Sequence, residues 1–307
     1  MSRTDPAVPA VDSDISSRLV WMFGSPRTGS TWLMQLFAEI SGVAVIDESY
    51  IPLHLVPIDH TVPDGEYFQQ GQRATDPNYV FAKRYLPEVQ PELRDLLTRG
   101  LKRQLAELGQ PTDPRWIVIK EPNGSHAADS TMALFPESRL LFLIRDGRDV
   151  IDSLIDAMLA RDSWWQQSQV SDEPRIVSER LAFIRHHANL WLQRTKSVQR
   201  AYEATPGQLR LQVRYETLLE DTDAGFGRML QWLGLSPDAG TVSAAVEKRS
   251  FSAIPDADKG AGKRARSANP GQWRERLRPG EIEVVERIMG PKLRELGYEA
   301  GSPASAE

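Results

Sequence analysis

The segment FGSPRTGSTW (residues 23–32) follows a short apolar run and carries two glycines at a phosphate-loop spacing. Gly24 and Gly29 match the glycines of the pattern G-x-x-x-x-G-K-[ST], and Thr31 matches its final hydroxyl. Ser30 stands where that pattern has a lysine. Because that lysine reaches the β- and γ-phosphates of a nucleoside triphosphate, its replacement predicts a phosphate ligand of another kind.

The residues on either side of this loop predict a strand and a helix. RLVWMF (Arg18–Phe23) is typical of a buried parallel strand. STWLMQLFAEISG (Ser30–Gly42) has helical apolar spacing, and its final glycine is typical of a helix end. The backbone N–H groups of residues 28–31 would therefore open a helix and point at an anion, helped by the helix dipole.

The rest of the chain alternates strands with helices. RWIVIK (Arg115–Lys120) and RLLFLI (Arg139–Ile144) read as buried strands, and Leu209–Asp221 as a strand leading into a helix. Helical patterns begin near Gly147 and cover Pro174–Ala204. This alternation predicts an α/β fold, a P-loop-like three-layer α/β/α arrangement with a mostly parallel central sheet and a helical C-terminal part.

Three cations are predicted at one edge of this sheet. Arg27 lies in the loop, and Lys120 and Arg145 follow two strands at their carboxyl ends, where such sheets bind ligands. Lys120 stands where a magnesium-binding strand would end in aspartate, which favours a metal-free phosphate ester. Ser153 lies two helical turns beyond Arg145 and can help to hold a second phosphate. Each cation could instead neutralise a local partner, but the set favours a ligand with two separated phosphates.

Composition and net charge exclude several classes of function. The 307 residues carry a net charge of −5, which argues against general nucleic-acid or membrane-surface binding. The absence of cysteine excludes disulfides and thiolate chemistry, and we expect a cytoplasmic protein without membrane insertion or a metal site. Residues 1–17 and 299–307 read as disordered tails around one domain, residues 18–298. The sequence leaves the oligomeric state open.

Five stretches, in this order, make the chain resemble the sulfotransferases that use 3′-phosphoadenosine 5′-phosphosulfate (PAPS). They are SPRTGSTW (25–32), FLIRDGRDVIDS (142–153), VRYETLLED (213–221), RSANPGQWRERL (266–277) and GPKLRELGY (290–298). The first two look like that family's 5′-phosphosulfate loop and its R-x(7)-S element for the 3′-phosphate. Other features, including the stretch KEP (120–122), are most similar to the tyrosylprotein and carbohydrate-type branch.

The resemblance implies roles for the loop residues. Arg27 replaces a lysine usual in cytosolic members and would contact the transferring sulfonate. Trp32 would stack on the adenine, although a core position on the first helix is an open alternative. The 5′-phosphate would be held by Thr28, Gly29, Ser30 and Thr31.

It also implies roles for residues later in the chain. Arg145 and Ser153 would bind the 3′-phosphate, and Tyr215 would touch the adenine edge or serve only as a strand-end aromatic. Arg266 and Ser267 would close over the 3′-phosphate. This closing contact departs from the family pattern, because Ser267 and the alanine after it stand where the family has Lys-Gly.

For the chemistry, the resemblance implies that Lys120 and Arg27 stabilise the sulfonate and the bridging oxygen. Cytosolic members place a histidine base two residues after that lysine, where this chain has Pro122. Glu48, in IDESYIPLHL, matches the glutamate base of the tyrosylprotein and carbohydrate-type members. Glu121 is a rival by position, with the alternative that it only balances the charge of Lys120.

The implied reaction is sulfuryl transfer from PAPS to a hydroxyl of a small-molecule, glycan or lipid acceptor, releasing adenosine 3′,5′-bisphosphate. No motif identifies the acceptor. Trp164 and Trp165 either line an aromatic or sugar pocket or pack between helices. Two other functions stay open: a P-loop kinase or NTPase with a degenerate loop, and a non-catalytic nucleotide-binding protein.

Overall fold

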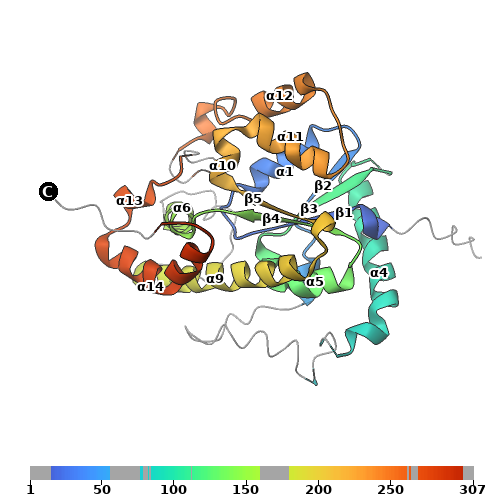
Figure 1. The fold of residues 1–307 in the computed structure, drawn as a ribbon, viewed down its shortest axis with the longest axis horizontal. Helices are drawn as coiled ribbons and strands as arrows, with labels where there is room; N and C mark the ends of the chain where they lie inside the picture. Colours follow the sequence, from blue (N-terminus) through green and yellow to red (C-terminus); the bar gives the residue numbers. More distant parts are fainter. Residues whose placement is uncertain are drawn as a thin grey trace, which may run out of the picture.

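A five-stranded sheet forms the centre of the molecule (Figure 1). The computed structural model describes residues 15–55, 77–78, 82, 84–111, 113–159, 180–260, 263 and 269–299. The strands are β1 (Leu19–Phe23), β2 (Val43–Asp47), β3 (Trp116–Lys120), β4 (Arg139–Ile144) and β5 (Arg210–Arg214). They lie in the order β2-β3-β1-β4-β5, and every neighbouring pair is parallel. The predicted three-layer α/β fold is confirmed.

Helices cover both faces of the sheet and bury a core against each (Figure 1). One face is covered by α1 (Ser30–Ala38), α10 (Tyr215–Glu220), α11 (Thr222–Trp232) and α12 (Ala239–Lys248). The opposite face is covered by α5 (Ala128–Leu134), α6 (Gly147–Leu159), α9 (Arg180–Ala204) and α14 (Pro279–Glu295). Successive residues of β1 alternate between the two cores, with Trp21 on the α9 side and Met22 on the α1 side.

Seven further elements, of which α4 is the longest, complete the set in the described chain. They are η1 (Ile15–Arg18), α2 (Ile51–Leu55), α4 (Leu86–Glu107), η3 (Asn123–Ala127), η4 (Gly207–Leu209), η5 (Asp256–Asp258) and α13 (Trp273–Arg276). Ile15 lies within residues 1–17, which the sequence predicts to be a disordered tail, yet its side chain is buried in the core on the α9 side. None of the helices described here combines the length and apolarity needed to cross a membrane.

The order of the strands creates a switch point at the end of β1. The chain leaves β1 through α1 to the outermost strand β2, returns with β3 beside β1, and continues with β4 on the other side of β1. In open parallel sheets, ligands bind outside the carboxyl ends of the strands at such a reversal. The loop that follows Phe23 starts at this point.

Candidate active site at the carboxyl edge of the sheet

The loop between β1 and α1 is shaped by close approach to its neighbours. Gly29 has a left-handed φ of 85°, and a Cβ placed there would lie 2.5 Å from the Cε2 atom of Tyr215. A Cβ at Gly24 would lie 2.3 Å from the carbonyl oxygen of Leu143 in β4. Arg27 is also left-handed, with a φ of 69°. Both glycines of the motif are therefore required by packing, and at Gly29 by conformation as well.

The loop offers unused hydrogen-bond donors at the start of α1. No bond to another described residue engages the backbone N–H groups of residues 28–31, which is the usual state of a helix N-terminus. The Thr28 hydroxyl is buried and has no partner in the described chain. The Gly24 N–H is already engaged, because it donates to the Ser125 hydroxyl at 2.9 Å. This donor set fits a phosphate group, as the sequence predicts.

A second group of polar side chains lies beside the loop. Arg145, at the end of β4, donates to the Arg27 carbonyl oxygen at 2.8 Å, and its guanidinium lies over the Tyr215 ring, 4.7 Å from the ring centroid. Its buried Nε atom has no partner in the described chain. Arg27 Nε donates to the Ser153 hydroxyl at 2.9 Å. The structure therefore brings Arg27, Arg145 and Ser153 together, and the Arg27 side chain reaches toward the predicted 3′-phosphate residues.

The two predicted adenine contacts lie against each other. The rings of Trp32 and Tyr215 meet edge to face, with centroids 6.1 Å apart. Trp32 is half-buried and donates from Nε1 to the Arg249 carbonyl oxygen at 2.9 Å. Both rings also pack into the core on the α1 side, so a structural contribution accompanies any contact with a ligand. Burial, more than the opposing charge of Arg145, raises the pKa of Tyr215.

Lys120 and Glu48 meet at the ends of β3 and β2. The Lys120 ammonium lies 3.4 Å from Glu48 Oε1 and 3.4 Å from the Thr31 hydroxyl, and it pairs with Asp47. Glu48 Oε2 accepts from Asn123 Nδ2 at 2.9 Å. A buried ammonium, a carboxylate and the first turn of α1 thus converge at one point of the sheet edge.

A backbone turn held by Glu121 presents Glu48. The Glu48 N–H donates to the Lys120 carbonyl oxygen at 3.1 Å, and Glu48 and Tyr50 have left-handed φ angles of 64° and 61°. The buried Glu121 carboxylate accepts from Ser49 N at 2.6 Å and from Ser49 Oγ at 2.5 Å. Among the described residues no ion pair joins Glu121 to Lys120, and the alternative that Glu121 balances the Lys120 charge stays a prediction. Burial raises the pKa of Glu121 to about 7, with the Ser49 hydrogen bonds opposing it and the Glu48 charge adding to it.

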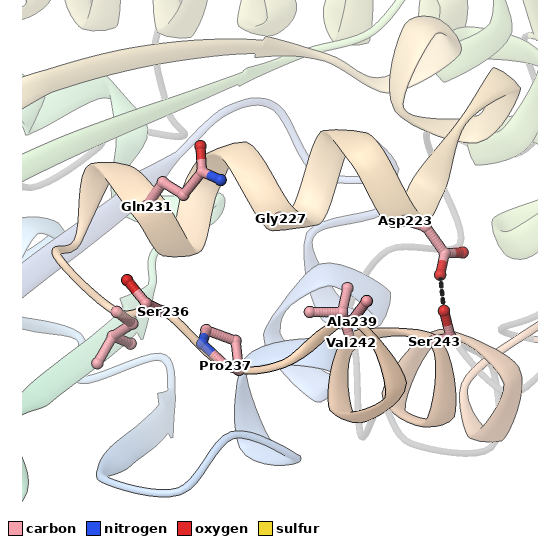
Figure 2. A pocket seen from close by; sticks show the side chains of 9 residues that line it. Asp223, Gly227, Gln231, Ser236, Pro237, Ala239, Val242 and Ser243 are labelled. Atoms are coloured by element: carbon pink, nitrogen blue, oxygen red, sulfur yellow. Dashed lines mark hydrogen bonds between the residues drawn. The ribbon is translucent and has the colours of Figure 1, made fainter.

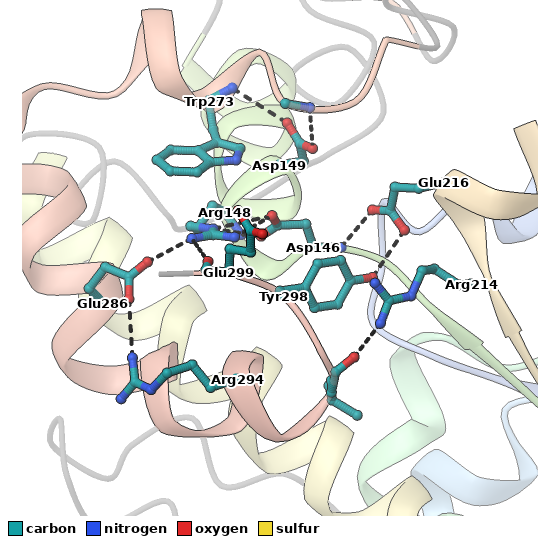
Figure 3. A network of polar contacts seen from close by, with 12 residues as sticks. Asp146, Arg148, Asp149, Arg214, Glu216, Trp273, Glu286, Arg294, Tyr298 and Glu299 are labelled. Atoms are coloured by element: carbon teal, nitrogen blue, oxygen red, sulfur yellow. Dashed lines mark hydrogen bonds and ion pairs between the residues drawn. The ribbon is translucent and has the colours of Figure 1, made fainter. Parts of the chain in front are cut away.

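A buried ionic network lies at the start of α6 (Figure 3). Arg148 is 1% exposed, bonds Asp146 at 2.7 Å and Glu286 at 2.8 Å, and lies over the Trp273 ring. Its Nη1 also donates to the Glu299 carbonyl oxygen at 2.8 Å. Because Trp273, Glu286 and Glu299 lie more than 120 residues away in the chain, sequence spacing gave no sign of these contacts.

Asp149 anchors the segment that follows Arg266 and Ser267, two predicted residues outside the described part of the chain. Its carboxylate accepts from Gly271 N at 2.7 Å and from Trp273 N at 3.4 Å (Figure 3). Burial is the main cause that raises the pKa of Asp149. The chain is thereby held against the helix that carries Ser153. Trp164 and Trp165 also lie outside the described residues.

Glu216 joins two of the family-like stretches. It accepts from Asp146 N at 2.9 Å and from the Tyr298 hydroxyl at 3.0 Å (Figure 3). Arg214 lies over the Tyr298 ring, 4.2 Å from its centroid. The stretch around Tyr215 and the stretch that ends at Tyr298 therefore meet next to Asp146, the neighbour of Arg145 in the chain.

A hollow between α11 and α12 is separate from this site (Figure 2). Its lining includes Gly227, Gln231 and Pro237, and Asp223 accepts from the Ser243 hydroxyl at one end. No lysine or arginine lines it, so it lacks the cations that an anionic ligand requires. Within the described residues no group of three or more His, Asp or Glu side chains could hold a metal ion.

Comparison with known proteins agrees with this arrangement. Residues 20–239 match the family described as "Sulfotransferase family". Sulfotransferase STF9 from Mycobacterium avium has a similar structure, with a TM-score of 0.55, 15% identity, and coverage of 93% of this chain and 78% of that one. The sulfotransferase domain from the curacin biosynthetic pathway gives a TM-score of 0.52 at 16% identity, covering 92% and 98%.

Mouse sulfotransferase SULT7A1, in a structure described as complexed with PAP, gives a TM-score of 0.49 at 12% identity and covers 92% of this chain and 86% of that one. No curated protein sequence matches the chain. The two solved structures with TM-scores above 0.5 support the fold, and the family match spans more than half of the sequence, from the first residues of β1 to the start of α12. The chain belongs to the sulfotransferase family.

Proposed function

We propose that the protein transfers the sulfuryl group of PAPS to a hydroxyl of a small-molecule, glycan or lipid acceptor and releases adenosine 3′,5′-bisphosphate. The observation that carries this proposal is that two groups of hydrogen-bond donors, suited to anions, both border Tyr215. One is the set of loop donors at residues 28–31, and the other is Arg145 with Ser153. A nucleotide with phosphates at both its 5′ and 3′ positions matches two such sites.

In the proposed complex, the loop amides and hydroxyls hold the 5′-phosphate while Arg145 and Ser153 hold the 3′-phosphate. Arg27 lies between the two sites, because its side chain bonds Ser153 and its carbonyl accepts from Arg145. Its guanidinium can therefore serve the 3′-phosphate, or swing toward the sulfonate as the family resemblance implies. Trp32 and Tyr215 lie where an adenine between the two sites would touch them.

The proposed chemistry uses Glu48 and Lys120. PAPS supplies an activated sulfuryl group: the acceptor oxygen forms a bond to sulfur as the bond from sulfur to the 5′-phosphate oxygen breaks. Glu48 takes the proton of the acceptor hydroxyl, and the Lys120 ammonium, 3.4 Å from Glu48, stabilises the negative charge that develops on the bridging oxygen. Asn123 holds Glu48 in place through Oε2, which leaves Oε1 on the side of Lys120.

Isothermal titration with adenosine 3′,5′-bisphosphate in EDTA tests the proposal, with ADP and AMP as comparison ligands. We expect the bisphosphate to bind at least about tenfold more tightly than AMP, because the 3′-phosphate adds charge-assisted bonds to Arg145. Arg145→Ala should abolish this difference, whereas Arg99→Ala, which removes an exposed arginine paired with Asp95, should keep it. A preference for ADP once Mg²⁺ is added would instead support a kinase or NTPase.

A further inference from the structure

Arg194, in the middle of α9, is a buried arginine without a hydrogen-bond partner among the residues that the structure describes. Its side chain lies in the interior, with 8% of the residue exposed, and its buried Nε has no acceptor. No hydrogen bond or ion pair joins its guanidinium to any other residue in the described ranges. Arg148, which is similarly buried, bonds both Asp146 and Glu286. Buried guanidinium groups normally have such partners, because an unpaired buried charge is strongly unfavourable.

The packing of α9 against η3 brings Arg194 near Glu48, the proposed base. Ser197, one helical turn further on, donates to the His126 carbonyl oxygen of η3 at 2.7 Å. Asn123, at the other end of η3, holds the Glu48 carboxylate at 2.9 Å. The Arg194 guanidinium lies within electrostatic range of Glu48. Arg194 therefore lies on the helix that packs against η3, and its charge acts on the carboxylate that η3 holds.

Arg194 keeps its positive charge at neutral pH, and its surroundings do not neutralise it. Burial lowers its pKa to about 10, and the Glu48 charge opposes that shift. Glu48 itself already contacts Lys120 and Asn123. His187, two turns earlier on α9, adds no negative charge, and burial lowers its pKa to about 3. In the described part of the chain, a cation without a hydrogen-bond partner therefore remains within electrostatic range of Glu48.

We propose that Arg194 binds an oxyanion carried by the acceptor, so that the acceptor is a hydroxyl compound with a carboxylate, phosphate or sulfate group. A guanidinium presents paired donors that match the two oxygens of such a group. The acceptor would then be held at two points, with its hydroxyl at Glu48 and its anionic group at Arg194. This inference rests on the proposed function, because Glu48 marks the place of the reacting hydroxyl.

The first experiment measures thermal unfolding with inorganic phosphate as the probe, while saturating adenosine 3′,5′-bisphosphate fills the nucleotide site. We expect phosphate to raise the Tm of the wild-type protein by a few degrees and to leave Arg194→Met unchanged. Arg200→Met removes an exposed arginine of the same helix and should respond as the wild type does. No phosphate effect in the wild type, or an equal effect in Arg194→Met, would overturn the proposal.

The Tm without phosphate separates a ligand-binding role from a structural one. Replacing an unpaired buried charge by an apolar chain of similar length should leave the Tm of Arg194→Met equal to or above that of the wild type. A marked decrease would show that Arg194 supports the fold and would overturn the proposal. If the bisphosphate fails to bind, the proposed function is contradicted independently of Arg194. The phosphate-induced Tm shifts of the wild type and Arg194→Met still decide whether Arg194 binds an oxyanion.

The second experiment asks whether the oxyanion belongs to the acceptor or is a free ion. Binding is compared for three acids and their amides: 4-hydroxybenzoate, 4-hydroxyphenylacetate and 3-hydroxybutyrate. We expect at least one acid to bind about tenfold more tightly than its amide, as one charge-assisted bond implies, and Arg194→Met to remove that preference. Binding of phosphate without preference for any acid over its amide would assign the site to a free ion and overturn the acceptor assignment.

Discussion

The ring of Tyr215 occupies the space in which a side chain on Gly29 would lie, because a Cβ at Gly29 would be 2.5 Å from Tyr215 Cε2. Gly29→Ala must therefore displace the ring and also hold alanine at a left-handed φ of 85°. We expect the variant to lose more than about 1 kcal/mol of unfolding free energy and about tenfold or more in bisphosphate affinity. Urea unfolding and calorimetric titration measure the two effects.

Gly42→Ala is the matched control for that substitution. Gly42 has a similar φ of 80°, but a Cβ there would lie 3.7 Å from its nearest neighbour, which is ordinary contact. It should show the conformational penalty alone and keep full bisphosphate affinity. Equal affinity losses in the two variants would contradict the role of the Tyr215 contact.

Ser153→Ala tests the second anion site. The Ser153 hydroxyl accepts from Arg27 Nε at 2.9 Å, so its removal deletes this bond and one proposed donor to the 3′-phosphate. We expect bisphosphate affinity to fall about two- to tenfold, as for one hydrogen bond, and AMP affinity to stay the same. Calorimetry with both nucleotides checks this, and Ser130→Ala, a buried serine on α5, serves as the control. Equal losses of affinity for AMP and for the bisphosphate would contradict a contact between Ser153 and the 3′-phosphate.

Lys120→Met and Glu48→Gln should separate catalysis from nucleotide binding. The two side chains approach to 3.4 Å, and each acts on charge or protons that move only during transfer. We expect kcat to fall by about 10²–10³ for each variant. Bisphosphate release from PAPS, measured with the best acceptor in a panel of hydroxyl compounds, reports the rate. Glu137→Gln, whose parent carboxylate pairs with Arg94 on the surface, is the control. A full rate in Glu48→Gln would remove Glu48 as the base.

The buried Glu121 carboxyl should make stability depend on pH. Burial raises its pKa from 4.5 to about 7, so the folded chain keeps a proton that the unfolded chain releases between these values. Stability should therefore decrease as pH rises from about 4.5 to 7, by on the order of 3 kcal/mol from this one group. The glutamine in Glu121→Gln does not titrate and still accepts from Ser49, so the variant should lack this part of the decrease.

Urea unfolding at pH 5, 6, 7 and 8 compares the two proteins. The variant should gain stability relative to the wild type as pH rises, while Glu283→Gln, at an exposed position on α14, should follow the wild type. Parallel curves for wild type and Glu121→Gln would show that Glu121 is ionised throughout this range.

Sequence predicted the strand-loop-helix unit well because its signals are local. The apolar run of β1, the two loop glycines and the helical spacing after Ser30 lie within about twenty residues of one another. The rule that ligands bind at strand ends then placed Lys120 and Arg145 at one edge, and the structure confirms this placement. The 22-residue helix α4 was not predicted; it carries Pro87 in its first turn and Pro91 inside the helix.

The parts that sequence did not predict depend on contacts between distant segments. Arg148 and Asp149 look like a solvated helix start until Glu286 and Gly271, more than 120 residues away, are placed against them. The isolation of Arg194 cannot be read from its helix, because its burial is set by η3 and the neighbouring helices. Buried charges of this kind become visible only when all possible partners are positioned.

The Arg148 network also fixes the smallest piece of the chain able to fold independently. The family match ends at residue 239, yet Arg148 depends on Glu286, on the fully buried Trp273 and on the carbonyl oxygen of Glu299. A fragment cut at the end of the match would keep only Asp146 among these partners and leave a buried guanidinium with the others missing, which destabilises by about 3–5 kcal/mol. Truncations and carrier fusions intended to preserve the fold should therefore be joined beyond Glu299.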